Sequence, residues 1–127
     1  RGDSGALGLL GLGEAPRVSL ERVRITPRRP AIGSAVTLTF DIAGRAVRAQ
    51  RLLVDLRVHY VKAHGATGPK VFKLKAVDLA PRGVVPFSKR LSLAQLTTRT
   101  HYPGRHAVEV LINGQAYPLG TFELTDR

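Results

Sequence analysis

The sequence lacks cysteine, methionine and tryptophan, and only 9 of its 127 residues are acidic. Without cysteine there can be no disulfides, thiolate zinc sites or thiol redox chemistry. No apolar run approaches the roughly 18 to 20 residues that a membrane-spanning helix needs, and no signal-peptide pattern opens the chain. These absences favour a soluble domain, for which we expect a cytoplasmic location. Because methionine is absent and the first residue is Arg1, we expect the chain to be an excised piece of a longer protein.

Positive charge dominates what is present. Lysine and arginine number 20, which gives a formal net charge of +11. Most of these cations are arginines, and the planar arginine fork suits phosphate oxygens better than a lysine point charge does, although GC-rich genomes also enrich arginine without function. This excess of positive charge predicts a polyanionic partner. The length of the chain indicates one domain.

Apolar residues recur with a period of two from Arg17 onward, which is typical of strands with one buried face. The strongest runs are residues 36–42, 52–60 and 108–112, and the last ends in Asn113-Gly114, a dipeptide that favours a tight hairpin turn into residues 115–124. Weaker strands are predicted over 18–25, 71–79 and 84–91. Seven short antiparallel strands indicate an all-β, immunoglobulin-like two-sheet sandwich over residues 17–127. Residues 1–16 are predicted to be a linker or the tail of a preceding domain.

Two local irregularities are also predicted. In the first strand Val18 and Leu20 are out of phase with Val23 and Ile25, which requires a bulge or a switch between sheets. Residues 91–99 are the one segment expected to form a helical turn or two.

The inventory of side chains argues against catalysis on this chain. The acids are scattered singly on the polar phases of strands, as with Asp41, Asp55 and Glu109, so paired carboxylates for acid and base catalysis are not expected. The four histidines lack the spacing and the carboxylate company of a metal site. We therefore expect no catalytic residues, no metal and no cofactor.

The lysines and one arginine-rich segment are the candidate binding residues. Lys62, His64 and Lys70 flank a glycine-containing turn, and Lys73 and Lys75, two residues apart, are expected to project from one face of a strand. Such lysines suit either contact with a nucleic-acid backbone or protection of an edge strand from aggregation, and the sequence leaves both open.

The segment 97–106 combines threonines, arginines, a tyrosine and a glycine, the groups that contact a sugar-phosphate strand. We predict a binding role for Arg99 and Arg105 and a structural role for Tyr102 and His106. A third basic group, Arg22, Arg24, Arg28 and Arg29, is better explained as solvated surface. Lys89 is in phase with apolar neighbours, so either a bulge turns it outward or it reaches an anion.

Several motifs together resemble one family. They are His59 to Ala63, Pro69 to Lys75, Thr97 to Arg99, Tyr102 to Gly104 with His106, and Val108 to Gly114. In this combination residues 6–124 look like the C-terminal immunoglobulin-like domain of AlkC-type DNA alkylation repair glycosylases.

The resemblance implies that the chain is a non-catalytic, duplex-clamping domain that contacts the DNA backbone. Its parent would be an alkylpurine DNA glycosylase acting in base excision repair of alkylated bases such as 3-methyladenine. The catalytic acid would lie in an N-terminal domain of HEAT-like helical repeats that this chain lacks. DNA contact is transferred only to the basic positions of the matching motifs, which are Lys62, Lys70, Lys73, Lys75, Arg99 and Arg105. The alternative is an extracellular or cell-surface immunoglobulin-like module that binds protein or glycan, which the positive charge and the absence of tryptophan weaken.

Overall fold

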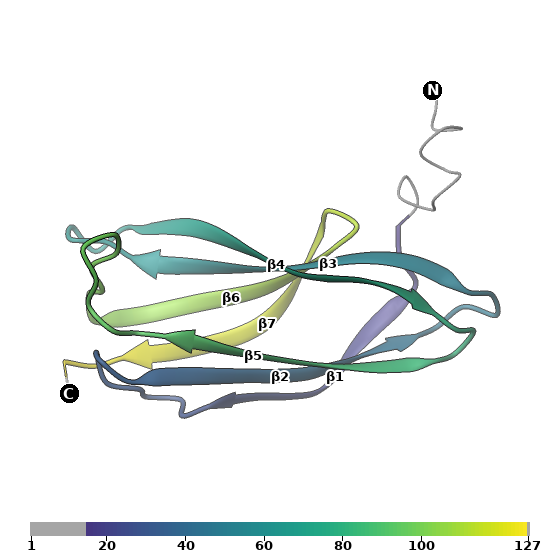
Figure 1. Cartoon of the computed structure of the whole chain (residues 1–127), viewed down its shortest axis with the longest axis horizontal. Coiled ribbons are helices and arrows are strands. Elements are labelled where there is room, and N and C mark those ends of the chain that lie inside the picture. The colour runs from purple at the N-terminus through teal and green to yellow at the C-terminus, as the bar shows by residue number, and fades with distance from the viewer. Residues whose placement is uncertain (1–14, 127) are drawn as a thin grey trace, which may run out of the picture.

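The computed structural model describes residues 15–126, which form two antiparallel β-sheets packed face to face (Figure 1). The predicted linker or tail over residues 1–16 lies outside the described residues except for Ala15 and Pro16. There is no helix in residues 15–126, so none there could span a membrane. The predicted all-β immunoglobulin-like sandwich is confirmed.

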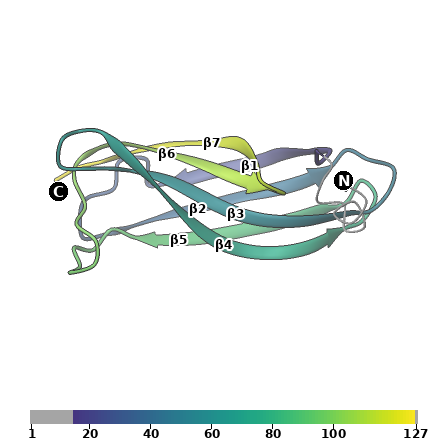
Figure 2. The ribbon, with the colours of Figure 1, turned by 90° about the horizontal axis from the view of Figure 1, so that it is seen from above.

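Seven strands build the sandwich. They are β1 (Val18–Thr26), β2 (Ala35–Gly44), β3 (Gln50–Val61), β4 (Thr67–Leu79), β5 (Val84–Ser92), β6 (Gly104–Ile112) and β7 (Gln115–Leu124). One sheet has the order β1-β2-β5 and the other the order β4-β3-β6-β7. The strand β4 therefore pairs with β3, whereas constant-type immunoglobulin domains place the fourth strand in the opposite sheet. Figure 2 shows the strands of both sheets running along the long axis of the molecule.

The core lies between the sheets and comes from the alternating positions that the sequence predicts. Each of Leu38, Leu56 and Val110 has no exposed surface, and Phe40 stacks on Phe87 across the β2–β5 pair with ring centroids 5.3 Å apart. Burial of one face of every strand fixes the register, because a slip of one residue would turn the apolar set outward.

The predicted irregularity in the first strand is a bulge. The register of β1 against β2 shifts between Glu21 and Arg24, and Arg22 adopts a positive φ of 52°. This extra residue lets Leu20 and Ile25 face the same core despite their odd spacing. The Asn113-Gly114 turn is also as predicted, with positive φ at both residues.

The predicted helical turn over residues 91–99 is wrong. Leu91 ends the inward phase of β5, Leu93 is fully buried, and the chain then forms a tight turn in which the backbones of Leu96 and Arg99 exchange two hydrogen bonds of 3.0 and 3.2 Å. The side chain of Gln95 accepts from the His101 N–H at 2.6 Å and donates to the His101 carbonyl at 3.0 Å. The Leu93 N–H and carbonyl bond to Ser34 and Gly33 of the β1–β2 connection at 2.8 Å each, so this segment does not pair internally as a helix would.

The expectation that Lys73 and Lys75 share a face is also wrong. Lys73 lies opposite Asp55 and Lys75 lies opposite Val54, so Leu74 is an extra residue in β4. Because directly opposed residues project from the same side of a sheet, Lys73 is on the outer face and Lys75 on the inner face.

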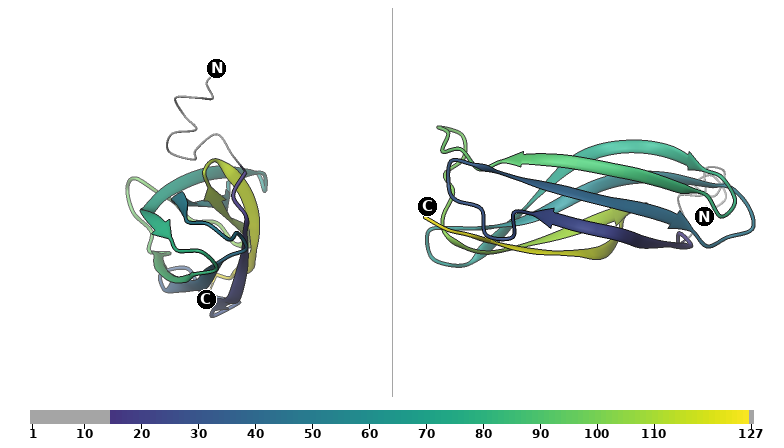
Figure 3. Two further views of the ribbon diagram at one scale, coloured as in Figure 1. Left: turned by 90° about the vertical axis from the view of Figure 1, so that its right-hand side faces the viewer. Right: turned by 90° about the horizontal axis from the view of Figure 1, so that it is seen from below.

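The connections gather at the two ends of the sandwich. The β3–β4 turn and the long β5–β6 connection lie at the same end as the C-terminus, on the left of Figure 1. The view from below in Figure 3 shows the β1–β2 connection at that end as well.

Candidate functional site

A groove of about 490 Å³ lies at this end, between the β3–β4 turn and the β5–β6 connection. It joins two of the basic groups that are far apart in the sequence. The polar side chains that line it are Tyr60 from the end of β3, Lys62 and His64 from the turn, and Thr98, Arg99, Thr100 and Tyr102 from the connection. The sequence predicts both groups, and the fold brings them to one site.

The groove contains one oriented guanidinium group. The Cζ atom of Arg99 lies 4.3 Å from the centroid of the Tyr60 ring, within the range of a cation–π contact. The side chain of Arg99 forms no ion pair or hydrogen bond with any of residues 15–126. Burial raises the pKa of Tyr60 while Arg99 opposes that shift, so the phenol is neutral near pH 7. The stacked guanidinium therefore has its N–H donors available to an external anion.

A buried histidine contacts two groove residues, Tyr60 and Val61, from the core side, in agreement with the structural role predicted for His106. Its side chain is fully buried, and its ring stacks on Phe122 with centroids 4.9 Å apart. Nδ1 donates to the carbonyl of Gly104 at 3.1 Å, so Nε2 accepts from the N–H of Val61 at 3.5 Å. Burial lowers the pKa of His106, although the Gly104 bond opposes this shift. A neutral ring is thereby fixed in one tautomer.

His101 is a second buried histidine and stands in the chain between the groove residues Thr100 and Tyr102. Its ring packs against Tyr60 with centroids 5.6 Å apart, and its Nδ1 atom has no hydrogen-bond partner among the described residues. Burial lowers the pKa of His101, and the neighbouring charge of Arg99 lowers it further. The sequence indicates this histidine only as a member of the segment 97–106. No sequence pattern indicates the Gln95 side chain, which holds the His101 backbone.

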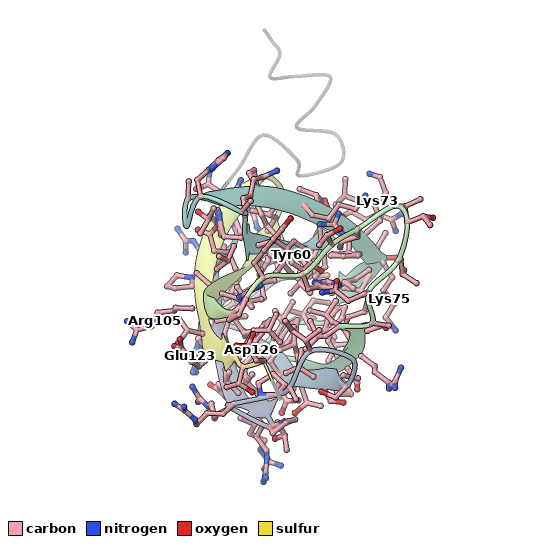
Figure 4. All side chains as sticks on the ribbon, turned by 90° about the vertical axis from the view of Figure 1, so that its left-hand side faces the viewer. Tyr60, Lys73, Lys75, Arg105, Glu123 and Asp126 are labelled. Carbon is pink, nitrogen blue, oxygen red and sulfur yellow. The ribbon has the colours of Figure 1, made fainter. Side chains whose placement is uncertain are left out.

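The six predicted contact residues fall on three surfaces. Lys62 and Arg99 line the groove, whereas Lys70 and Lys75 lie on the inner side of β4, opposite Val58 and Val54. Lys73 and Arg105 lie on the outer face of the four-stranded sheet, opposite Asp55 and Glu123. Figure 4 shows Arg105 beside Glu123, across the molecule from Lys73 and Lys75.

That outer face is rich in acids and carries several ion pairs. Glu109 accepts from Arg57 Nε at 2.8 Å and from His59 Nε2 at 2.7 Å, and these two hydrogen bonds lower the pKa of Glu109. The β3–β6 register sets Glu109 directly opposite Arg57, so this acid is held by basic side chains and not by a second carboxylate. Arg51 pairs with Asp78 at 3.0 Å, and Arg105 approaches Glu123 at 3.8 Å. Cations and acids largely balance on this face.

The third basic group lies on β1 and the β1–β2 connection. Arg22, Arg24, Arg28 and Arg29 are all exposed. Arg22 approaches Asp41 at 3.8 Å, and Arg28 donates to the Thr121 carbonyl at 3.4 Å. This arrangement agrees with the predicted solvated surface. Within residues 15–126, no group of three or more histidine or acidic side chains could hold a metal ion.

A family sequence profile matches most of the chain. The profile of the C-terminal Ig-like domain of the uncharacterised protein YhaZ matches residues 19–126. The chain belongs to this YhaZ C-terminal Ig-like family. The YhaZ protein of Bacillus subtilis (strain 168) is 32% identical over 115 residues, which cover 91% of this chain and 32% of YhaZ. The chain therefore spans about a third of that relative.

Solved structures extend the comparison for this member of the YhaZ C-terminal Ig-like family. It is similar to the alkylpurine DNA glycosylase AlkC of Pseudomonas fluorescens, bound to DNA containing an abasic site analog, with a TM-score of 0.84 and 39% identity over 94% of this chain and 33% of that chain. The resemblance to AlkC-type proteins is therefore confirmed. A β-glucosidase from Listeria innocua in complex with glucose has a TM-score of 0.65 at 14% identity, over 85% of this chain and 16% of that chain, a likeness of fold alone.

Proposed function

We propose that this domain is a non-catalytic, duplex-clamping module that contacts the DNA backbone as part of a bacterial, cytoplasmic alkylpurine DNA glycosylase. The parent protein would remove alkylated bases such as 3-methyladenine in base excision repair. Its catalytic residues would lie in an N-terminal domain of HEAT-like repeats, which this domain would face across the duplex.

The observation that carries this proposal is the groove that Lys62 and Arg99 both line, with the Arg99 guanidinium over the Tyr60 ring. The groove combines cations, threonine hydroxyls and a tyrosine, which are the side chains that bind sugar and phosphate. No acidic residue lines it. The similarity to AlkC, which was solved bound to DNA, supports nucleic acid as the anion rather than a protein or glycan partner.

Binding of a fluorescein-labelled duplex, followed by anisotropy as salt is varied, tests the proposal. Affinity should fall steeply with salt, with a log–log slope of about −0.9 for each phosphate contacted. Arg99→Gln should weaken binding and flatten the slope by about one contact, and Arg99→Lys should restore part of the affinity because it keeps the charge but not the fork. Arg24→Gln is the matched control, since it removes an exposed arginine from β1, a strand that contributes no residue to the groove lining.

Equal losses for Arg24→Gln and Arg99→Gln would mean that net charge alone drives binding, and the groove would lose its assigned role. Absence of duplex binding by the unaltered chain at about 20 mM salt, where phosphate contacts are strongest, would overturn the proposed function itself.

A further inference from the structure

The open side of the sandwich, between the edge strands β4 and β5, is the second place where unpaired positive charge gathers. These strands border different sheets, and no ladder joins them. On the opposite side the sheets are tied together, because Glu123 N–H donates to the Arg28 carbonyl at 2.8 Å and Thr125 N–H donates to the Pro30 carbonyl at 2.9 Å. The β4–β5 side is therefore the accessible flank of the core.

Three lysines on this flank occupy positions where the strand pattern expects apolar residues. Lys70 lies opposite Val58, Lys75 opposite Val54 and Lys89 opposite Leu38, and all three partners are core residues. We call Lys70, Lys75 and Lys89 the lysine track. The β2–β5 register runs without a shift from Ala35 to Ala43, so no bulge turns Lys89 outward.

The ammonium groups of the track lie within cation–π range of two aromatic rings. The Nζ atoms of Lys70 and Lys89, from opposite sheets, lie 5.8 and 5.4 Å from the centroid of the Phe72 ring. The Nζ atom of Lys75 lies 5.7 Å from the Phe87 ring. Long side chains of this kind cover apolar surface with their methylenes and keep the charge in water.

The charges of the track form no ion pair with any carboxylate of residues 15–126. Every ion pair between residues 15–126 uses an arginine or His59 on the basic side, and none uses a lysine. The acids are instead concentrated on the outer sheet faces. A row of unpaired cations with no carboxylate beside it is suited to an external polyanion.

The track is continuous with the groove. Gly68 lines the groove and lies opposite Tyr60 on the inner side of β4, and Lys70, Phe72 and Lys75 follow on that same side. At about 3.3 Å per residue, Lys70 and Lys75 are roughly 13 to 17 Å apart. One strand of duplex DNA offers a phosphate about every 3.4 Å along the axis, so this length faces several successive phosphates.

We propose that a DNA phosphate backbone leaves the groove along the open β4–β5 side and is held there by Lys70, Lys89 and Lys75. This inference rests on the proposed DNA-binding function and adds Lys89 as a contact. It also gives the backbone a path that excludes Lys73 and Arg105, which lie on the acid-bearing outer face. A lysine point charge on a flexible stem suits such sequence-independent contacts.

Two matched pairs of variants test the path in the full chain with the labelled duplex. Lys89→Gln and Arg90→Gln remove one charge each from adjacent residues of β5 that face opposite sides of the sheet. Lys75→Gln and Lys73→Gln do the same on β4. Lys89→Gln and Lys75→Gln should each flatten the salt slope by about 0.9, so that the drop in affinity from about 50 to about 200 mM salt shrinks by roughly 3.5-fold. Arg90→Gln and Lys73→Gln should leave the slope unchanged. Circular dichroism and thermal unfolding verify that every variant folds.

The outcomes separate this inference from the function on which it rests. If Arg99→Gln weakens binding while Lys75→Gln and Lys89→Gln bind as the unaltered chain does, the track is wrong and the groove stands. A stronger effect of Lys73→Gln than of Lys75→Gln would place the backbone on the outer face and overturn the track. If the unaltered chain binds no duplex, both proposals fail.

Two other roles for these lysines would also appear in the data. Lysines that only guard the edge strands against pairing should, when all three are replaced by glutamine, give dimers in size-exclusion chromatography with duplex affinity unchanged. The triple variant could also lose the binding of poly-L-glutamate that the unaltered chain shows, while its duplex affinity stays the same. That result would assign the track to an acidic protein segment. Either result would overturn the inference.

Discussion

The two buried histidines of the site predict that the domain loses stability on mild acidification. His106 has no exposed surface and His101 is only 4% exposed, and burial lowers the pKa of both. A lowered histidine pKa means that the folded chain stays neutral at a pH where the unfolded chain takes up protons. Stability from these groups is therefore complete above the unfolded pKa of about 6.5 and is lost as pH falls below it.

The magnitude follows from linkage. A histidine with an unfolded pKa near 6.5 and a lowered folded pKa can reduce the free energy of unfolding by at most about 1.4 kcal/mol between about pH 7.5 and 5.5. The pair sets an upper limit of about 2.7 kcal/mol over this interval. Glu109, whose pKa is lowered, does not contribute there, because its stabilisation is lost only below the ordinary glutamate pKa.

Urea unfolding at the two pH values measures this loss. His106→Gln and His101→Gln should each lower stability at neutral pH and remove about half of the pH dependence. Equal stability of the unaltered chain at both pH values would refute the assignment of neutral, buried imidazoles to this site.

Three further predictions concern the core, the connection and the outer face. Phe40→Ala removes a fully buried ring stacked on Phe87 and should cost about 3 to 5 kcal/mol in urea unfolding, whereas a loss under about 1 kcal/mol would contradict the packing described. Gln95→Ala breaks both hydrogen bonds to the His101 backbone and should cost about 1 to 2 kcal/mol, with faster amide hydrogen exchange at His101; unchanged exchange would show that the clamp is not needed. Glu109→Gln should remove part of the stability that is otherwise lost as pH falls below about 4.5, and an identical acid profile for the variant would contradict the Arg57–Glu109–His59 network.

Strands with one buried face could be predicted from the sequence, because alternation leaves little freedom of register. The run from Leu52 to Tyr60 is such a strand. In β1, the change of phase between Leu20 and Val23 marks the position of the bulge. The bulge at Leu74 was not predictable in the same way, because lysines flank it on both sides and either phase of β4 looks half polar. A strand at a sheet edge can hold lysines on its inner side, which a buried central strand cannot.

The candidate site was predicted as separate pieces. The basic turn at Lys62 and the segment around Arg99 are visible in the sequence, but their meeting in one groove depends on the tertiary arrangement of β3, β4 and the β5–β6 connection. Arg99 stacks on Tyr60, a residue 39 positions earlier, and no local pattern encodes that contact. The roles of Gln95 and of Lys89 likewise appear only when the strands are paired.

Titration of the isotope-labelled chain with an unlabelled DNA duplex, followed by amide chemical shifts, tests most directly that this domain binds DNA through the groove. Shift changes should concentrate on the β3–β4 turn and on residues 96–102, fade as salt is raised, and leave the β4–β5 turn at the other end of the sandwich unaffected. Changes centred on the opposite end, or on the outer face of β1 and β2, would contradict binding through the groove.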